Sequence, residues 1–300
     1  MSFQSRRDLL KSAALIAAAG TLAGVVLGQQ QPELLRNPAA GGAKADPWKG
    51  LKVGVASYTF HSLPLAACIE GIKQIDMHYV SIKDSHLKMD STPEERKAVV
   101  QQFKDAKILP ISCGVVAMKS EAAIAQAFDY ARDIGVPVIV ADPSPAMLAT
   151  VEKYVKERGI KIAIHNHGPE SKDFKSPADV WAAVEKLDPR VGLCIDVGHT
   201  KRAGMEPVDA IRKFKDRLYD VHMKDIIVDP SGRNTNTGTE VGRGILDIRG
   251  MLQALLDIGF TGHCGFEFEK AAKNPLPGLA ESVGYTKGVM STIEPSHNKA

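Results

Sequence analysis

The chain has 300 residues, of which 44% are hydrophobic, so it can bury a large core. Its formal net charge is +3, and Arg6, Arg7 and Lys11, offset by Asp8, contribute +2 of this. The rest of the chain is therefore nearly neutral, which argues against a general nucleic-acid-binding surface. Its 4 cysteines show neither metal-site nor disulfide-framework spacing, so we expect buried free thiols.

The N-terminus has the features of a twin-arginine secretion signal. Arg6 and Arg7 precede an apolar stretch that runs from about Ala13 to Leu27. We expect residues 1–30 to form a twin-arginine signal peptide and residues 31–48, rich in Gln, Pro, Gly and Ala, to form a flexible tether. This pattern predicts export to the periplasm through the twin-arginine pathway. An uncleaved membrane anchor is the alternative.

After the tether, short apolar runs alternate with segments of helical periodicity. Predicted strands cover residues 51–60, 78–82, 109–116, 136–141, 160–164, 191–195, 218–221 and 262–266. Predicted helices cover residues 63–76, 92–107, 121–134, 145–158, 177–187, 207–214 and 248–258. The polar, Gly-rich segment 229–242 is expected to be a long loop. Eight strands alternating with helices predict an α/β fold, a (β/α)8 TIM barrel of the catalytic type over residues 49–300.

Side chains that can bind metal follow the last four predicted strands. These are His165 and His167 after strand five, Asp196 after strand six, His222 after strand seven and Glu267 after strand eight. Parallel strands of a closed barrel all end at one face, so these side chains should converge there. Carboxylates and imidazoles gathered at that face predict a divalent-metal site with room for a substrate.

These motifs resemble those of the sugar phosphate isomerase/epimerase superfamily. The superfamily has xylose isomerase-like TIM barrels and is related to apurinic endonucleases of the endonuclease IV type. The similarity runs from about Leu51 to Glu269, and the segments that carry it are Asp196-x-x-His199, His222-x-Lys224-Asp225, Glu267 and the Gly242-Arg243-Gly244 turn. The resemblance implies one divalent metal ion held after strands four, six, seven and eight, here by Asp142, Asp196, His222 and Glu267.

Asp142 departs from the family pattern, because the epimerases usually have Glu at this position. A shorter side chain could still bind the metal but would reach less well toward a substrate carbon. The two-base epimerase mechanism places a carboxylate on each face of the sugar, and Asp142 puts that mechanism in doubt. The alternative role for Asp142 is that of a turn or helix-cap residue ahead of Pro143.

Further polar residues near the strand ends are candidates for the site. His165 and His167 flank Asn166, so in an extended chain they point the same way. The candidate catalytic residues are Glu267, His167, His165 and Lys83. The candidate substrate-binding residues are His199, His86, Tyr58, Lys224, Arg243 and Glu269.

The chemistry that fits such a site is proton transfer next to a carbonyl group. Oxygen-rich ligation favours Mn²⁺ or Mg²⁺, and Zn²⁺ or Co²⁺ could also bind. We therefore expect a sugar isomerase or epimerase that acts on a keto- or aldo-sugar, or on an oxidised sugar, through a metal-stabilised enediolate. The alternatives are a lyase that performs β-elimination on a 3-keto-glycoside, a non-catalytic sugar-binding barrel and an apurinic endonuclease-type hydrolase. The expected partner is a small-molecule carbohydrate, without nucleic acid, and membrane contact would arise only through an uncleaved signal.

Overall fold

The computed structural model describes residues 46–228 and 238–294. The predicted signal, most of the predicted tether and the middle of the predicted loop 229–242 lie outside these residues. The chain is already packed at Trp48, whose side chain is 6% exposed and belongs to the main hydrophobic core. The packed unit therefore begins slightly before the predicted boundary at residue 49.

Eight parallel strands close into a barrel, which confirms the predicted fold. In chain order they are β1 (Lys52–Ala56), β2 (Tyr79–Ile82), β3 (Leu109–Met118), β4 (Val138–Pro143), β5 (Lys161–His165), β6 (Val191–Asp196), β7 (Leu218–Met223) and β10 (His263–Phe266). Each strand pairs with its sequence neighbour in the barrel, and β10 pairs with β1 to complete the ring. Strands such as β6 and β10 are buried along their whole length, as expected for a sheet that is covered on both faces.

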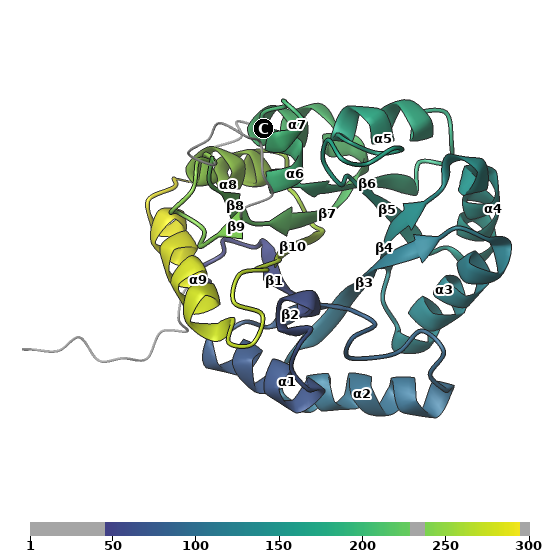
Figure 1. Ribbon diagram of the computed structural model, residues 1–300, viewed down its shortest axis with the longest axis horizontal. Helices are drawn as coiled ribbons and strands as arrows, with labels where there is room; N and C mark the ends of the chain where they lie inside the picture. Colours follow the sequence, from purple (N-terminus) through teal and green to yellow (C-terminus); the bar gives the residue numbers. More distant parts are fainter. Residues whose placement is uncertain (1–45, 229–237, 295–300) are drawn as a thin grey trace, which may run out of the picture. The chain divides into compact units, whose positions relative to one another are not determined.

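Helices surround the barrel, as Figure 1 shows. They are α1 (Leu65–Gln74), α2 (Pro93–Asp105), α3 (Glu121–Ile134), α4 (Leu148–Arg158), α5 (Pro177–Val184), α6 (Val197–Arg202), α7 (Pro207–Lys213), α8 (Ile248–Asp257) and α9 (Leu276–Ser291). Three 3₁₀ turns, η2 (Ser57–Phe60), η3 (Pro145–Met147) and η4 (Lys215–Arg217), join neighbouring elements. Within the described part of the chain, no helix has the length and apolar character needed to cross a bilayer.

Local sequence explains several helix starts. Thr92 and Ser176 each cap a helix through a capping box, with proline at the first helical position. Helix α3 ends at Gly135, which has φ +73° and so adopts the left-handed conformation that glycine tolerates. Sequence signals of this kind explain why the predicted bounds of α3 match the observed ones.

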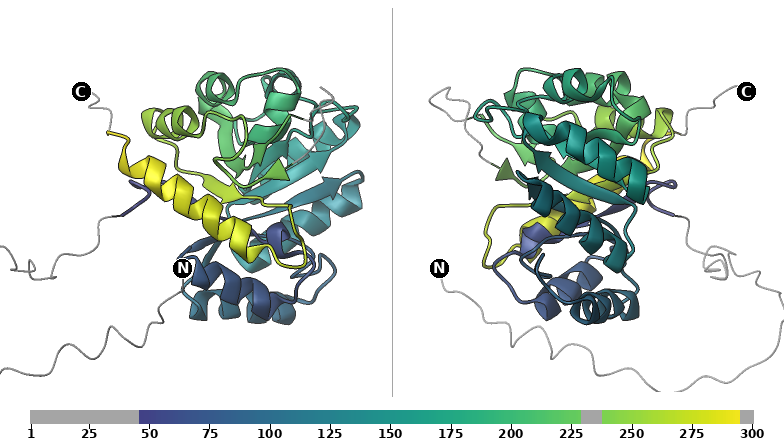
Figure 2. Two further views of the ribbon diagram at one scale, coloured as in Figure 1. Left: turned by 60° about the vertical axis from the view of Figure 1, so that its left-hand side comes forward. Right: turned by 90° about the vertical axis from the view of Figure 1, so that its right-hand side faces the viewer.

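Two of the observed helices and one hairpin were not predicted. Helix α6 follows β6 directly, and helix α9 lies on the outside of the barrel after the last strand (Figure 2). A short antiparallel hairpin, β8 (Asp225–Ile226) with β9 (Gly238–Thr239), leads out of β7. The predicted loop 229–242 therefore contains β9 at residues 238–239.

All four cysteines are buried and free, as predicted. Burial raises the pKa of Cys68, Cys113 and Cys194 to about 12 and that of Cys264 further still. The thiols therefore stay protonated and pack as small apolar groups.

Candidate active site

The barrel fold brings four predicted site residues together at the ends of neighbouring strands. His165 ends β5, Asp196 ends β6, His222 is the last residue but one of β7, and Glu267 directly follows β10. Their metal-binding atoms all lie within 4.8 Å of one another, and all four side chains are buried. We call these four residues the ligand group.

Adjacent donor atoms in the ligand group are closely spaced. His165 Nε2 lies 3.1 Å from His222 Nδ1 and 3.4 Å from Asp196 Oδ2, and His222 Nδ1 lies 3.2 Å from Glu267 Oε2. Ligands around a small divalent ion, with bonds of about 2.0–2.2 Å, have similar separations. Asp196 Oδ2 is fully buried, and besides His165 Nε2 it faces Lys224 Nζ at 2.9 Å. A buried carboxylate oxygen that faces an imidazole nitrogen and a cation has the surroundings of an atom that can bind a metal ion.

Helix α6 explains how Asp196 is oriented. Asp196 is the N-cap of this helix, and its Oδ1 accepts the backbone N–H of His199 at 2.8 Å. The backbone N–H of Asp196 donates to Asn166 Oδ1 at 3.0 Å, and Asn166 Nδ2 donates to Thr200 at 3.2 Å. Asp196 Oδ1 therefore caps helix α6, and Asp196 Oδ2 faces the other side chains of the ligand group.

Lys224 places a positive charge directly beside the ligand group. Its Nζ lies 2.8 Å from Glu267 Oε2, 2.9 Å from Asp196 Oδ2 and 3.6 Å from Glu269 Oε2. The Lys224 side chain is 5% exposed, so water screens these ion pairs poorly. Burial alone would lower the pKa of Lys224, but Asp196, Glu267 and Glu269 raise it well above 10.5. Lys224 is therefore a permanent cation of the site.

The two imidazoles of the ligand group differ in their protonation. Burial lowers the pKa of His165 to about 3, so this ring is neutral. Burial would also lower the pKa of His222, but Cys194 and Glu267 beside it raise that pKa well above 6.5. Burial would raise the pKa of Glu267, whereas His222 and Lys224 hold it well below 4.5. Glu267 is thus a carboxylate, and in the absence of a metal a proton is shared within the group.

Several other predicted residues line the mouth around the ligand group. The ring of His167 lies 4.5 Å from that of His165, and the ring of His199 lies 5.9 Å from it. Burial lowers the pKa of His199 and raises that of Glu269, which stands beside Lys224. Burial also raises the pKa of Tyr58, with further contributions from Glu269 and Glu267.

Asp142, the predicted fourth ligand, lies outside the ligand group. Its Oδ2 pairs with Lys119 Nζ at 2.8 Å, and its side chain is 28% exposed. His165, which the sequence suggested as a metal-binding or catalytic residue, is the fourth member of the group. The group that could hold a metal thus contains a strand-five imidazole and does not contain the strand-four carboxylate.

Three further predicted residues make contacts that involve no ligand-group side chain. Arg243 is exposed and pairs with Glu281, which lies on helix α9. His86 is buried with its Nδ1 3.1 Å from Ser57 Oγ, and Lys83 Nζ donates to the carbonyl of Val115 at 2.6 Å. The observed contacts of Arg243 and His86 are those of structural side chains.

Asp225 has a role that the sequence did not reveal. Its buried carboxylate accepts four backbone N–H groups, those of Ile226, Gly242, Gly244 and Leu246, at 2.9–3.1 Å. A Cβ atom at Gly244 would lie 2.1 Å from Asp225 Oδ1, so only glycine fits there. The Asp225 side chain thus fixes the Gly242-Arg243-Gly244 turn against the end of β7.

The fold agrees with the comparisons to known proteins. Residues 71–288 match the model of the xylose isomerase-like TIM barrel. The inosose dehydratase of Klebsiella pneumoniae subsp. pneumoniae is 28% identical over 144 residues, which are 42% of this chain and 48% of that protein. That of Lacticaseibacillus casei is 23% identical over 151 residues. The chain thus spans about half the length of these curated relatives.

Solved structures show the same barrel. An uncharacterised protein of Parabacteroides distasonis is 25% identical with a TM-score of 0.61, over 79% of this chain and 98% of that one. The 3-keto-D-glucoside 4-epimerase of E. coli is 14% identical with a TM-score of 0.63, over 79% and 99% of the two chains. At 14% identity, the second likeness shows the fold alone.

Proposed function

Because this chain belongs to the xylose isomerase-like TIM barrel family, we propose that it removes the proton next to the carbonyl group of a polyhydroxylated ketone. The observation that carries the proposal is the ligand group itself. Two carboxylates and two imidazoles meet at the barrel end where this architecture places its active sites. The relatives named above act on inososes or keto-sugars by their names, and these compounds are polyhydroxylated ketones.

The ligand group is suited to a divalent metal ion. His165, Asp196, His222 and Glu267 would hold the ion, with the buried Asp196 Oδ2 as one ligand atom. Bound there, the ion would act as a Lewis acid that polarises the substrate carbonyl. A mixed nitrogen and oxygen donor set accepts Mn²⁺, Co²⁺ or Zn²⁺ more readily than Mg²⁺, which prefers oxygen ligands.

Residues beside the ligand group would move the proton. His167 is half-buried with its ring against His165, and it is not part of the ligand group. We assign to His167 the removal of the carbon-bound proton. Lys224, a permanent cation, would stabilise the negative charge that develops on the substrate oxygen.

We favour elimination over epimerisation as the outcome. An epimerase of the two-carboxylate type needs a strand-four carboxylate opposite Glu267, whereas Asp142 is paired with Lys119. In elimination the base takes the carbon-bound proton, the neighbouring carbon–oxygen bond breaks, and the departing oxygen leaves with a proton as water or an alcohol. The inosose dehydratase relatives favour the same outcome by name. Epimerisation is the second candidate, because solved epimerases share the barrel.

Turnover in D₂O distinguishes these outcomes. Protein loaded with Mn²⁺ and then freed of unbound ion is incubated with a panel of keto-cyclitols, ketoses and 3-keto-glycosides, and the products are identified by NMR. An unsaturated product supports elimination, and a deuterated stereoisomer supports epimerisation. His167→Asn should lose about a hundredfold or more in rate, whereas the exposed His78→Asn is a matched control. Full activity of His167→Asn without deuterium in any product would refute the proton-transfer proposal.

We also propose that the protein works in the periplasm after export through the twin-arginine pathway. The proposal is supported by the Arg6-Arg7 pair ahead of an apolar stretch. The double variant Arg6→Lys with Arg7→Lys should remain in the cytoplasm, as measured by cell fractionation. Normal export of this variant would show that the signal is of another type.

A further inference from the structure

A column of three titratable side chains lies inside the barrel beneath the ligand group. Asp220 and His222 alternate along β7 and therefore point to the same side of the strand. His263 of β10 is the register partner of Asp220, and Gly265 is the partner of His222. All three side chains of the column are at most 3% exposed. Branched apolar residues usually fill the interior of such a barrel. The presence of three ionisable side chains there therefore needs an explanation.

The spacing in the column leaves four of its polar atoms without hydrogen bonds, whereas His263 Nδ1 lies 3.5 Å from Ser112 Oγ. His263 Nδ1 lies 3.6 Å from Asp220 Oδ2, and His222 Nε2 lies 4.0 Å from Asp220 Oδ1. Among the described residues, both Asp220 oxygens, His222 Nε2 and His263 Nε2 have no hydrogen-bond partner. A buried carboxylate in this condition costs free energy of folding, which points to a role outside stability.

Two glycines make room for the column. A Cβ atom at Gly265 would lie 2.4 Å from His263 Cε1, and one at Gly54 would lie 2.6 Å from His263 Nε2. The imidazole of His263 thus occupies the space that these glycines leave free. Asp220 consequently has an imidazole on each side, one toward the ligand group and one away from it.

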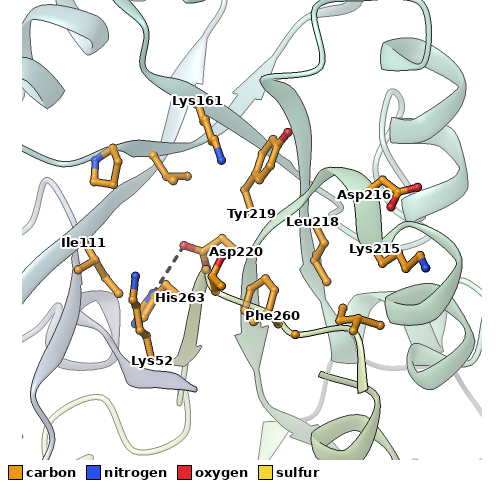
Figure 3. A pocket seen from close by; sticks show the side chains of 16 residues that line it. Lys52, Ile111, Lys161, Lys215, Asp216, Leu218, Tyr219, Asp220, Phe260 and His263 are labelled. Atoms are coloured by element: carbon orange, nitrogen blue, oxygen red, sulfur yellow. Dashed lines mark ion pairs between the residues drawn. The ribbon is translucent and has the colours of Figure 1, made fainter. Parts of the chain in front are cut away.

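The column faces inward and not toward solvent. Asp220 and His263 line the inner end of a cavity of about 380 Å³ at the N-terminal end of the barrel, shown in Figure 3. Their side chains are nevertheless at most 3% exposed. Lys52, Lys161 and Tyr219 line the same cavity. On its other side, Asp220 Oδ1 faces His222 Nε2 at 4.0 Å.

The geometry of His222 determines what Asp220 can do. Its Nδ1 is the atom that faces Glu267 and His165, so Nδ1 must be free of a proton when it binds a metal. The ring proton then resides on Nε2, which faces Asp220. Metal-binding histidines commonly donate their second N–H to a carboxylate, and this contact fixes the tautomer and increases the basicity of the ligand.

We propose that Asp220 is a positioning residue for the metal site: the negative charge of its carboxylate, 4.0 Å from His222 Nε2, favours the Nε2–H tautomer of His222, and His263, 3.6 Å from Asp220, supports it from the opposite side. The inference rests on the metal site proposed above. It adds that residues well below the mouth, which contact no substrate, set the affinity of the ligand group for a divalent ion.

Zinc binding tests this role without an activity assay. The affinity of the full chain for Zn²⁺ is measured by chelator competition at fixed pH for the wild type, Asp220→Asn and Asp220→Leu. We expect affinity to fall about tenfold in Asp220→Asn, which lacks the charge, and about a hundredfold in Asp220→Leu. Asp216→Asn removes the same charge from an exposed position at the same cavity and should bind Zn²⁺ as the wild type does.

A spectroscopic signature separates positioning from a structural role. In ¹⁵N-labelled, Zn²⁺-bound protein, the His222 ring should show a protonated Nε2 in the wild type, and that signal should shift in Asp220→Asn. Unfolding of the metal-free proteins is measured alongside. A variant that is less stable but binds Zn²⁺ with unchanged affinity and unchanged His222 signals would overturn the proposal.

Asp220→Asn is nearly isosteric, so it decides the question alone if Asp220→Leu does not fold. The two proposals also fail in different ways. A wild type that binds no Zn²⁺ would overturn the metal site and this inference together. A wild type that binds Zn²⁺ as tightly as a folded Asp220→Asn would overturn only the role of Asp220.

Discussion

Replacing Lys224 with methionine should separate the stability of the metal-free protein from its affinity for metal. Lys224 Nζ lies within 2.9 Å of carboxylate oxygens of both Asp196 and Glu267, and all three side chains are buried. Lys224→Met keeps the length of the side chain but leaves the two carboxylates without their cation. A divalent ion bound to the same oxygens would then no longer be repelled by the positive charge of Lys224.

The expected magnitudes follow from burial. Removing one partner of a buried ion pair costs about 3–5 kcal/mol, because the remaining charge stays desolvated. For a domain of this size, that loss corresponds to a melting temperature lower by roughly 6–20 °C in the metal-free state. We expect the variant to bind a divalent ion about tenfold more tightly, and each tenfold recovers about 1.4 kcal/mol in the metal-bound state.

Chelator-treated protein is unfolded thermally with and without saturating Mn²⁺, and its Mn²⁺ affinity is measured by titration calorimetry. The stability that metal restores should equal the gain in binding free energy, since the four states form a closed cycle. Lys73→Met is the matched control, because Lys73 and Glu70 are also 2.9 Å apart but exposed, and it should unfold as the wild type does. An equal loss of stability with and without Mn²⁺, or weaker Mn²⁺ binding in Lys224→Met, would refute this reasoning.

Two further predictions concern the loops that frame the mouth. Asp225→Ala should lower the free energy of unfolding, measured in urea, by at least about 3 kcal/mol, because four backbone N–H groups lose their acceptor. Asp225→Asn keeps one acceptor oxygen and should lose less stability. Equal stability of the wild type and both variants would contradict the role of Asp225. The hydrogen bond from Lys270 lowers the pKa of Glu240 from 4.5 to about 2 in the folded protein. The Glu240 carboxylate therefore stabilises the fold fully above pH 4.5, and this stabilisation is lost as the pH falls toward 2. Glu240→Gln should therefore lose less stability than the wild type between pH 5 and pH 3 in urea titrations, and an unchanged loss would show that the pair does not contribute.

The barrel was predictable because its signals are local. Apolar runs of strand length alternate with helical segments, and capping residues such as Thr92 and Ser176 mark helix starts. Helix α9 escaped prediction because Gly278, Gly284 and Gly288 weaken its intrinsic helix propensity. Packing of buried side chains on this helix, such as Leu279 and Met290, overrides that weakness. Such long-range packing cannot be recognised in a local pattern.

Three of the four ligand-group residues were also predictable, since Asp196, His222 and Glu267 each stand where a strand ends. His165 was a candidate beside His167 and Asp142, but position along a strand does not specify which of these side chains meets the other three across the barrel. The roles of Asp220 and Asp225 were hidden for the same reason. Each acts on atoms of other residues, His222 Nε2 for Asp220 and the 242–246 backbone for Asp225, and only the folded chain brings these atoms together.

The identity of the fourth ligand is the point on which the family pattern and the structure make opposite predictions. If Asp142 binds the metal, Asp142→Asn should weaken Mn²⁺ binding strongly. In the structure Asp142 pairs with Lys119, and His165 Nε2 lies 3.1 Å from His222 Nδ1 and 3.4 Å from Asp196 Oδ2. We therefore expect His165→Asn to weaken Mn²⁺ binding at least about a hundredfold.

Asp142→Asn should change Mn²⁺ affinity by less than about threefold, which corresponds to a rim charge and not to a ligand. Titration calorimetry on the two variants measures both affinities directly, and circular dichroism establishes that each is folded. If Asp142→Asn weakens Mn²⁺ binding strongly and His165→Asn weakens it little, then Asp142 is the fourth metal ligand and His165 is not. That result would also remove the structural reason to favour elimination, because Asp142 would then be available as the second carboxylate that a two-base epimerase requires.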